Sequence, residues 1–469
     1  MEKQNTVNVS RIIDQSTLGS FQWGIFVLCS LCLIMDGFDV QAMGYVAPAI
    51  LREWSIPNSA LGPVFSVGLF GVLIGSLLFS MLADRVGRRP VLIGVALYFS
   101  AFTLLTARAN SIQELLAIRF VAGIGLGGIM PNAMALVGEY SPAKIRITVM
   151  MIVSTGFTAG AAIGGFIAAW LIPSFGWRSV FYFGGVIPLV IAVLMWVWLP
   201  ESLQFLVLRG KNVLRGKNTS NVSRWLERIQ PGLTTGSAPN YVVQEVKKEG
   251  VPAVHLFREG RSGTTMLLWV LNFMNLLNLY FLSSWIPTVV RDAGYATSIA
   301  VLVGAAVQVG GTIGAFGNGW LISRFGWVPA LSACFTVACL SIASIGQPGL
   351  PLALLFAVVF VAGWCVVGGQ PGVNALAAVY YPTYLRSTGI GWGLGIGRIG
   401  AIVGPVLGGE LMTLKWSNRQ LFLAASVPAL ISAIVMLALR DAIRRTPAAA
   451  PVQLPSTPAS SEAAQRIPT

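Results

Sequence analysis

Long hydrophobic runs follow one another along almost the whole chain and are separated by short polar segments. An α-helix of about 20 apolar residues spans the roughly 30 Å hydrocarbon core of a bilayer. Twelve runs reach this length, so the pattern predicts an all-α integral membrane protein with twelve transmembrane helices. They lie at 21–47, 62–82, 90–108, 113–138, 147–171, 177–199, 264–290, 298–322, 327–346, 350–378, 388–412 and 418–440.

A polar interruption after the sixth run divides the chain into two bundles of six helices. Composition agrees with this assignment, because 55% of the 469 residues are hydrophobic and only 10% are charged, which excludes a soluble protein of this length. The tail is rich in Ala, Pro and Ser, which is typical of disorder. The predicted units are an N-terminal segment (1–20), a first bundle (21–199), a linker (200–263), a second bundle (264–440) and the tail (441–469).

The net charge of +14 comes mainly from segments on one side of the predicted membrane. With both termini in the cytoplasm, 23 of the 31 Lys and Arg residues lie in cytoplasmic segments and six lie in the opposite loops. This is the positive-inside asymmetry of a protein with an even number of spans. The charge therefore sets the orientation and does not indicate binding to nucleic acid. The two remaining cations, Arg119 and Arg398, fall inside predicted helices.

The same pattern of Gly, Pro and Arg residues recurs in the two bundles at an offset of 239 or 240 residues. Six helices per repeat leave corresponding helices with the same orientation, so the pattern predicts parallel repeats around a pseudo-two-fold axis along the membrane normal. A substrate is then expected between the two bundles. The matching pairs include Pro48 and Pro287, Arg85 and Arg324, Gly128 and Gly368, Pro131 and Pro371, Arg146 and Arg386, and Gly160 and Gly400.

Two carboxylates lie within the first hydrophobic run, in the sequence Asp36-Gly37-Phe38-Asp39. A charge at bilayer depth is costly and is by default functional. The three-residue spacing predicts that both acids lie on one helix face. At the repeat offset, the second bundle has the uncharged amides Asn275 and Asn278. Because only one bundle has titratable groups, we favour proton coupling over structural pairing or substrate contact alone.

Arg119 is the expected partner of these acids. Asp36 lies roughly 22 Å along a helix that begins at the cytoplasmic side, and Arg119 lies about 9 Å along a helix that begins at the opposite side. The two positions therefore have similar depth in the membrane. An ion pair between Arg119 and either acid that breaks on protonation is one interpretation, and a permanent buried pair is the other.

Arg398 lies roughly 15 Å inside the eleventh predicted helix, where no acid precedes Glu410. A guanidinium at this depth needs an anion, and its planar donors suit a carboxylate held by two hydrogen bonds. We predict either contact with a substrate carboxylate or pairing with an Asp of the first helix.

Charged residues also gather at the predicted cytoplasmic ends of the helices, where a charge network is expected to close the inner side. Asp84 is expected to face the N-terminus of another helix, such as the eleventh. The alternative is that the arginines only set the topology. The predicted gate residues are Asp84, Arg85, Arg88, Glu139, Arg146 and Arg386.

The sequence offers little for metal, redox or enzyme chemistry. Cys29 and Cys32 lie within an apolar helix and are expected to be small core residues. His255 stands alone in a basic segment, without the clustered ligands of a metal site. We therefore expect no cofactor, no bound metal and no enzymatic activity.

The segment Ala83-Asp84-Arg85-Val86-Gly87-Arg88-Arg89 resembles the loop signature of the major facilitator superfamily, with Ser80 in place of its first Gly. The segment 119–125 is similar to the fourth-helix motif of that superfamily, and 199–202 to the Pro-Glu-Ser that ends its sixth helix. The motif at 36–39 resembles the first-helix Asp-Gly-x-Asp of the aromatic acid/proton symporters within it. The second repeat departs from the loop signature, with Ser323 at the position that matches Asp84.

The resemblance implies the major facilitator fold, in which the first and fourth helices line a central cavity. It also implies proton-coupled uptake of small aromatic carboxylates by alternating access. The expected substrate contacts are then Arg398, the two amides Asn275 and Asn278, Gln370 for a ring hydroxyl, and Trp392 for stacking on the ring.

The implied setting is a bacterial inner membrane, with a monomer as the functional unit and the lipid bilayer, protons and substrate as partners. The alternatives are a proton symporter for another small organic anion, such as a dicarboxylate, or for a sugar. A membrane sensor that does not transport is disfavoured because the sequence shows no signalling domain.

Overall fold

The computed structural model describes residues 6–210, 215–230, 240–242, 253–258, 260–382 and 385–440. Within these residues, twelve helical segments are long and apolar enough to cross a membrane, which confirms the predicted fold class. The N-terminal half contains α2 (Ser20–Trp54), α3 (Leu61–Val86), α4 (Arg88–Thr106), α5 (Ile112–Gly127), α6 (Ile129–Tyr140), α7 (Arg146–Phe175) and α8 (Arg178–Trp198). The C-terminal half contains α11 (Ser262–Asp292), α12 (Thr297–Phe325), α13 (Trp327–Ile345), α14 (Leu352–Val366), α15 (Gln370–Tyr380), α16 (Arg386–Thr413) and α17 (Asn418–Ala438).

The repeat is visible in one shared irregularity. The fourth span is divided into α5 and α6 at Gly128, and the tenth is divided into α14 and α15 at 367–369. Gly128 and Gly368 correspond at the repeat offset, and each is followed by a proline three residues later. Proline removes a helical hydrogen bond donor and clashes with the preceding turn, so the interruption recurs at the same position in both halves.

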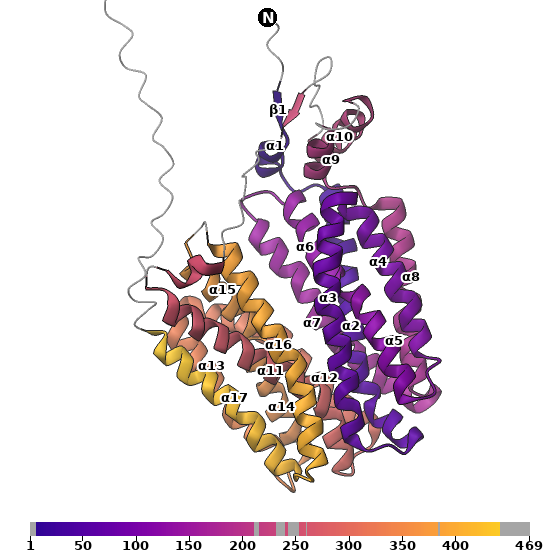
Figure 1. Ribbon diagram of the computed structural model, residues 1–469, viewed down its shortest axis with the longest axis vertical. Coiled ribbons are helices and arrows are strands. Elements are labelled where there is room, and N and C mark those ends of the chain that lie inside the picture. Colours follow the sequence, from indigo (N-terminus) through magenta and orange to yellow (C-terminus); the bar gives the residue numbers. More distant parts are fainter. Residues whose placement is uncertain are drawn as a thin grey trace, which may run out of the picture.

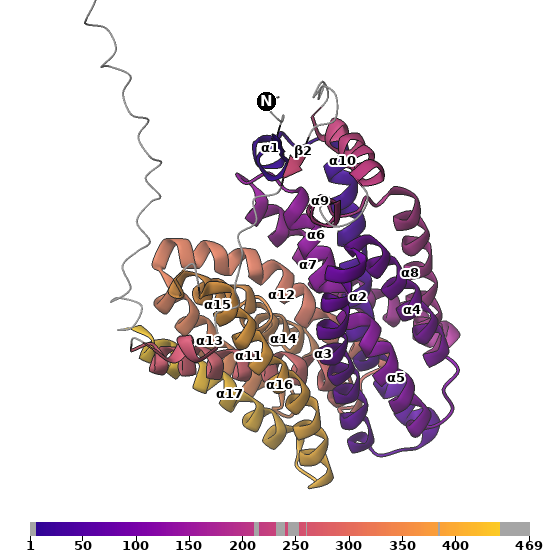
Figure 2. The ribbon, with the colours of Figure 1, turned by 45° about the horizontal axis from the view of Figure 1, so that its top comes forward.

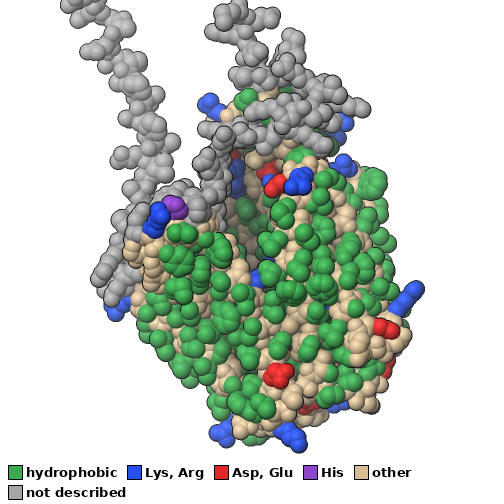
Figure 3. All heavy atoms as spheres, in the orientation of Figure 1, with side chains coloured by type: hydrophobic (Ala, Val, Ile, Leu, Met, Phe, Trp, Pro, Cys, Tyr) green, Lys and Arg blue, Asp and Glu red, His purple; other side chains and the backbone are tan. Residues whose placement is uncertain are grey.

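The outer surface of both halves is apolar, as contact with lipid requires. Figure 3 shows hydrophobic side chains over the flanks of both bundles and charged side chains mainly near the two ends. Large exposed side chains on these flanks include Trp196, Trp320 and Leu340. Exposure of this kind would cause aggregation in water, but it matches the hydrocarbon core of a membrane.

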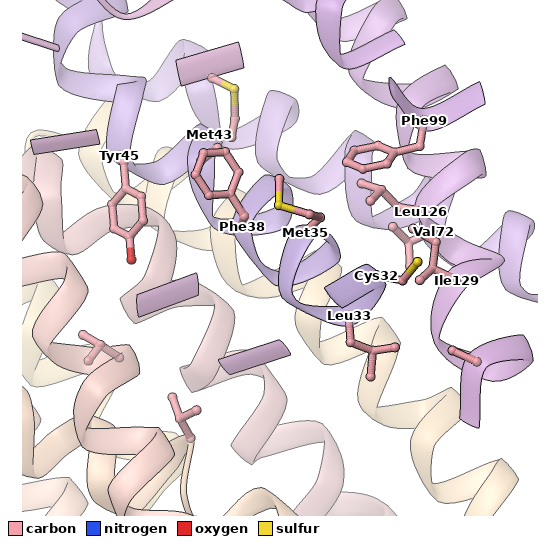
Figure 4. Packing of buried hydrophobic residues seen from close by; sticks show 14 of the residues in the cluster. Cys32, Leu33, Met35, Phe38, Met43, Tyr45, Val72, Phe99, Leu126 and Ile129 are labelled. Carbon is pink, nitrogen blue, oxygen red and sulfur yellow. The ribbon is translucent and has the colours of Figure 1, made fainter. Parts of the chain in front are cut away.

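α2 is the most enclosed helix of the N-terminal half, and Figure 4 shows some of its own buried apolar side chains, such as Met35, Phe38 and Met43. Its backbone touches that of α7. A Cβ at Gly37 would lie 1.8 Å from the Phe157 carbonyl oxygen, and a Cβ at Gly160 would lie 1.9 Å from the Ile34 carbonyl oxygen. The glycine between the two acids is therefore required by helix packing, which explains its place in the motif.

The chain outside the spans adds structure to one end of the molecule (Figures 1 and 2). β1 (Thr6–Asn8) pairs in parallel with β2 (Asn240–Val242), and α1 (Val9–Gln15) and α9 (Leu203–Gly210) lie next to them. α10 (Arg215–Ile229) and two 3₁₀ helices, η1 (Asn58–Ala60) and η2 (Ala253–Phe257), complete the described elements. The tail, for which we predict disorder, lies outside the described residues.

The two halves touch at one end of the molecule and diverge at the other (Figures 1 and 3). At the end away from α9 and α10, Asn58 Nδ2 donates to Asp292 Oδ2 over 2.5 Å, and Ser66 Oγ donates to the Ile402 carbonyl over 2.6 Å. Among the described residues, every hydrogen bond between the halves lies on this side. We call the two sides the closed end and the α9/α10 end.

Packing of α16 on α11 provides a test of the fold. A Cβ at Gly400 would lie 2.3 Å from the Phe273 carbonyl oxygen, whereas nothing lies within 4 Å of a Cβ at Gly395 on the same helix. We expect Gly400→Ala to lower the free energy of unfolding by about 1–3 kcal/mol through overpacking. Gly395→Ala is expected to be neutral or to stabilise the helix by up to about 1 kcal/mol.

The measurement is thermal unfolding of the purified variants in one detergent. Equal melting temperatures for Gly400→Ala and Gly395→Ala would contradict the close approach of α11 and α16.

Candidate functional site

A cavity of about 380 Å³ lies between the two halves. The N-terminal half lines it with α2, α3, α5, α6 and α7, and the C-terminal half with α11, α12, α15, α16 and the 367–369 segment. These are the first, second, fourth and fifth spans of each repeat, so the two halves contribute equivalent walls. Figure 3 shows a hollow between the halves at the α9/α10 end.

The two acids of α2 have different surroundings. Asp36 lines the cavity and makes no hydrogen bond or ion pair with any described residue. Asp39 is fully buried and lies against α4 and α5. The prediction that both acids lie on one face holds only in part, because the angular difference of about 60° between positions i and i+3 is enough to separate cavity from core. Gly37, which lies between them, packs on α7.

Asp39 is paired with Arg119, inside the N-terminal half. Arg119 Nη2 lies 2.8 Å from Asp39 Oδ2 and 3.4 Å from the Asp39 carbonyl oxygen, and Thr103 Oγ1 donates to Asp39 Oδ1 over 3.1 Å. Both side chains are almost completely shielded from solvent. The structure therefore selects Asp39 over Asp36 as the partner of Arg119.

Arg398 faces the cavity from α16 and is half-buried. Within the described part of the chain, its guanidinium makes no hydrogen bond or ion pair. Asp36 lines the same cavity and attracts the Arg398 guanidinium electrostatically, but the two side chains do not form an ion pair. The cavity is therefore lined by one unpaired cation and one unpaired acid on opposite halves.

The predicted amide contacts form a network in the wall of the C-terminal half. Asn275 Nδ2 donates to Gln370 Oε1 over 2.7 Å. Gln370 Nε2 in turn donates to Asn272 Oδ1 and Asn374 Oδ1, each over 3.0 Å. Gln370 and Asn374 line the cavity, whereas Asn275 lies behind them. Asn275 thus positions Gln370 instead of facing the cavity itself.

Two other predicted substrate contacts do not lie at the cavity. The Asn278 amide faces the Ala425 carbonyl oxygen at 2.8 Å and the Ala429 backbone nitrogen at 3.1 Å, on α17. Trp392 is 47% exposed and stacks on Trp269 with 5.8 Å between the ring centroids. The position of a residue along a helix predicts its depth in the membrane, but the rotation of the helix about its axis decides which way its side chain faces. The side chains of Asn278 and Trp392 both face away from the cavity.

The predicted gate residues lie at the α9/α10 end, but their described contacts stay within the N-terminal half. Arg88 Nη1 pairs with Glu139 Oε1 at 2.8 Å, and Arg146 pairs with Asp14 of α1. Asp84, Arg85 and Arg386 are exposed and make no ion pair with a described residue. The closed arrangement predicted for these charges is therefore not the arrangement in this structure.

Some contacts in this region were not predicted from the sequence. Glu201 accepts hydrogen bonds from the backbone nitrogens of Arg88 at 2.9 Å and Arg89 at 3.2 Å, and so caps the start of α4. Gly87, with φ +112°, makes the turn that presents these nitrogens. A carboxylate at a helix N-terminus also interacts favourably with the helix dipole.

Sequence reasoning also missed the cavity residues Tyr280 and Gln308. Tyr280 lines both the main cavity and a chamber of about 30 Å³ beside Arg119. Gln308 lines the closed end of the main cavity. Single polar groups within apolar helices were the available signal, and many such groups in this chain lie elsewhere.

The fold and the cavity define a membrane transporter built from two repeated six-helix halves, with a central cavity between them. The sequence pattern of the Major Facilitator Superfamily matches residues 29–345 and 268–467. The chain belongs to this superfamily, which confirms the resemblance found in its motifs.

Individual relatives are also similar over nearly their whole length. The chain is 40% identical to the 4-hydroxybenzoate transporter of Pseudomonas putida, over 92% of this chain and 96% of the relative. It is 38% identical to a gallate transporter of Pseudomonas putida, over 94% and 97%. The crystal structure of a bacterial homologue of the human lysosomal transporter Spinster has the same fold, with a TM-score of 0.69, 19% identity, and coverage of 91% and 99%.

The buried pair between Asp39 and Arg119 yields a stability prediction. Asp39→Asn or Arg119→Gln alone leaves one unpaired buried charge, and each is expected to cost about 3–5 kcal/mol. The double variant removes both charges and is expected to be more stable than the sum of the two losses implies. A double-mutant cycle by thermal unfolding in detergent measures this coupling.

The exposed pair between Glu53 and Arg178 serves as the control, because both side chains are partly in solvent. The same cycle there is expected to show a coupling of at most about 1 kcal/mol. Strictly additive losses at Asp39 and Arg119 would show that the two charges are stabilised independently.

Proposed function

We propose that the protein takes up small aromatic carboxylates, such as hydroxybenzoates, together with protons across a bacterial inner membrane by alternating access. The observation that carries the proposal is Arg398, whose guanidinium lies in a cavity between the two halves and has no hydrogen bond or ion pair with a described residue. A cation at this depth needs an anionic partner, and a carboxylate matches its planar donors. Relatives with 38–40% identity are named for the transport of 4-hydroxybenzoate and gallate, which are acids of this class.

The cavity also supports the aromatic character of the substrate. Its walls are mostly apolar, and Phe157 and Tyr280 line it from opposite halves. Arg398 is the only Lys or Arg among the described residues that line this cavity. One cation and apolar walls favour a monocarboxylate with a ring over a dicarboxylate, which needs a second positive group, and over a sugar, which needs many polar groups.

In this proposal Asp36 carries the proton. It is the acid that reaches the cavity, and it has no ion pair among the described residues. Asp39 and Arg119 then act as a fixed pair that holds α2 against α5 while Asp36 exchanges its proton with the cavity.

Energetics favour such coupling. An anion that enters a negative interior works against about 2.3 kcal/mol per charge per 100 mV, and one accompanying proton cancels this electrical cost. A second proton, or a pH gradient at about 1.36 kcal/mol per unit, supplies the energy for accumulation.

The orientation follows from the positive charge. Most Lys and Arg of the described residues lie toward the α9/α10 end, and we propose that this end faces the cytoplasm together with both termini. The structure then corresponds to the state open to the cytoplasm. In the opposite state we expect Asp84, Arg85, Arg88, Glu139, Arg146 and Arg386 to contribute to the closure of this end. One chain holds the complete cavity, so a monomer suffices.

Asp36 provides the first test of proton coupling. We expect Asp36→Asn to lose accumulation of labelled 4-hydroxybenzoate in cells, because the amide cannot load and release a proton. It is expected to retain exchange of labelled for unlabelled substrate in vesicles, because the amide resembles the protonated acid. Wild-type accumulation is expected to fall to equilibration when a protonophore is added.

Glu410→Gln is the matched control. It also replaces an acid by its amide, but Glu410 is exposed and does not line the cavity. Wild-type accumulation that is insensitive to the protonophore, or full accumulation by Asp36→Asn, would contradict coupling through Asp36.

Arg398 provides the second test. We expect Arg398→Gln to weaken benzoate binding to the purified protein by about 10- to 150-fold, which corresponds to the loss of charged hydrogen bonds of about 1.5–3 kcal/mol. Arg324→Gln removes the same charge from an exposed position on α12 and is expected to leave affinity unchanged. Calorimetric titration measures both. Equal affinities for the two variants would remove Arg398 from the binding site.

A further inference from the structure

Gln308 of α12 belongs both to the cavity and to the contact that closes it. It lines the cavity, and its Nε2 donates to Gln41 Oε1 over 3.1 Å and to Ser283 Oγ over 2.9 Å. Gln41 Nε2 in turn donates to the Ser283 carbonyl oxygen over 2.6 Å. These three buried side chains join α2 of one half to α11 and α12 of the other.

The hydrogen bonds of Gln308 leave one strong acceptor free. A carboxamide has two N–H donors and one oxygen acceptor. Both N–H donors of Gln308 point to the acceptors on Gln41 and Ser283, which fixes the orientation of the amide. Its Oε1 accepts no hydrogen bond from any described residue. An oxygen in the wall of an apolar cavity with no hydrogen-bond partner is a favourable acceptor for a donor group of a bound ligand.

Gln370, the amide predicted to bind a ring hydroxyl, is in the opposite situation. Its Nε2 donates to two asparagines and its Oε1 accepts from Asn275. Its hydrogen-bonding capacity is therefore largely used within the wall of the C-terminal half. Of the two glutamines that line the cavity, Gln308 is the one with an unused acceptor.

The depth of Gln308 fits the far end of a substrate held by Arg398. Close contacts of Gly400 with Phe273 and of Gly404 with Leu277 set α16 in register with α11, so the backbone of Arg398 lies near the level of Phe273. Gln308 contacts Ser283, ten residues further along α11, or roughly 15 Å toward the closed end. An arginine side chain, a benzene ring and a hydrogen bond at each end together fill a distance of this order.

We propose that Gln308 Oε1 accepts a hydrogen bond from a ring hydroxyl of the substrate and so selects aromatic acids hydroxylated opposite the carboxylate. This inference rests on the proposed transport of aromatic carboxylates and deepens it. Arg398 binds the carboxylate, Phe157 and Tyr280 contact the ring, and Gln308 distinguishes a hydroxyl from a hydrogen atom at the far end. The acceptor is pre-oriented, because Gln41 and Ser283 hold the amide.

The test compares the binding of 4-hydroxybenzoate and benzoate to purified full-length protein by calorimetric titration. Wild type is expected to bind 4-hydroxybenzoate about 3- to 10-fold more tightly, the range of one net hydrogen bond. Gln308→Met has similar length but no acceptor, and is expected to bring this ratio to about one while benzoate affinity stays within about 2-fold.

Two matched variants separate the acceptor from the other roles of these glutamines. Gln41→Met removes one of the two acceptors that hold the Gln308 amide and leaves Ser283, so it is expected to keep a ratio between that of wild type and one. Gln370→Met changes the other cavity glutamine and is expected to keep the wild-type ratio. A ratio that persists in Gln308→Met would overturn the assignment, and its collapse in Gln370→Met would assign the hydroxyl contact to Gln370 instead.

A measurement on wild type alone covers the case in which Gln308→Met does not fold. 4-Fluorobenzoate has a substituent at the same position but no donor, and is expected to bind like benzoate. Binding as tight as that of 4-hydroxybenzoate would overturn the role of Gln308 and leave the proposed function standing. If wild type binds none of the three acids, both proposals fail.

Discussion

The constraint on which this molecule depends is the cost of charge in a medium without water. Asp36, Asp39, Arg119 and Arg398 all lie in transmembrane helices, and each needs a partner, a proton or a ligand. The structure treats them in two ways. Asp39 and Arg119 neutralise each other inside one half. Asp36 and Arg398 lie on different halves and meet only across the cavity.

In the proposed mechanism, this division separates the charges that stabilise one half from the charges that bind a proton or a substrate. A pair within one half moves with that half and is unaffected when the two halves change their relative position. Charges on different halves, in contrast, change their environment with every such movement. In the transport cycle that we propose, a proton on Asp36 or an anion on Arg398 would therefore alter the relative free energies of the states, which is the requirement for a ligand to drive a conformational change.

Much of the fold could be predicted from the sequence. Hydrophobic runs indicate the transmembrane spans, and the spacing of Gly, Pro and Arg indicates the repeat. The position of Arg119 along its helix also predicted correctly that it lies at the same membrane depth as the acids of α2. Rotation about the helix axes could not be obtained in this way. It decides that Asp36 faces the cavity and Asp39 the core, and that Asn278 faces α17. Gln308 went unnoticed because a single amide in an apolar helix has no distinguishing pattern.

The pairing of β1 with β2 has a mechanical consequence. β1 leads into α1, which is held to α7 by the Asp14 and Arg146 pair, while Leu256 of η2 accepts a hydrogen bond from Thr265 of α11. Two described parts of the segment between the bundles, β2 and η2, are therefore each held to one half. Only the ten residues 243–252 join a strand anchored on one half to a turn anchored on the other. The eleven steps from Val242 to Ala253 span at most about 40 Å, which sets a covalent limit to how far the two halves can separate at this end.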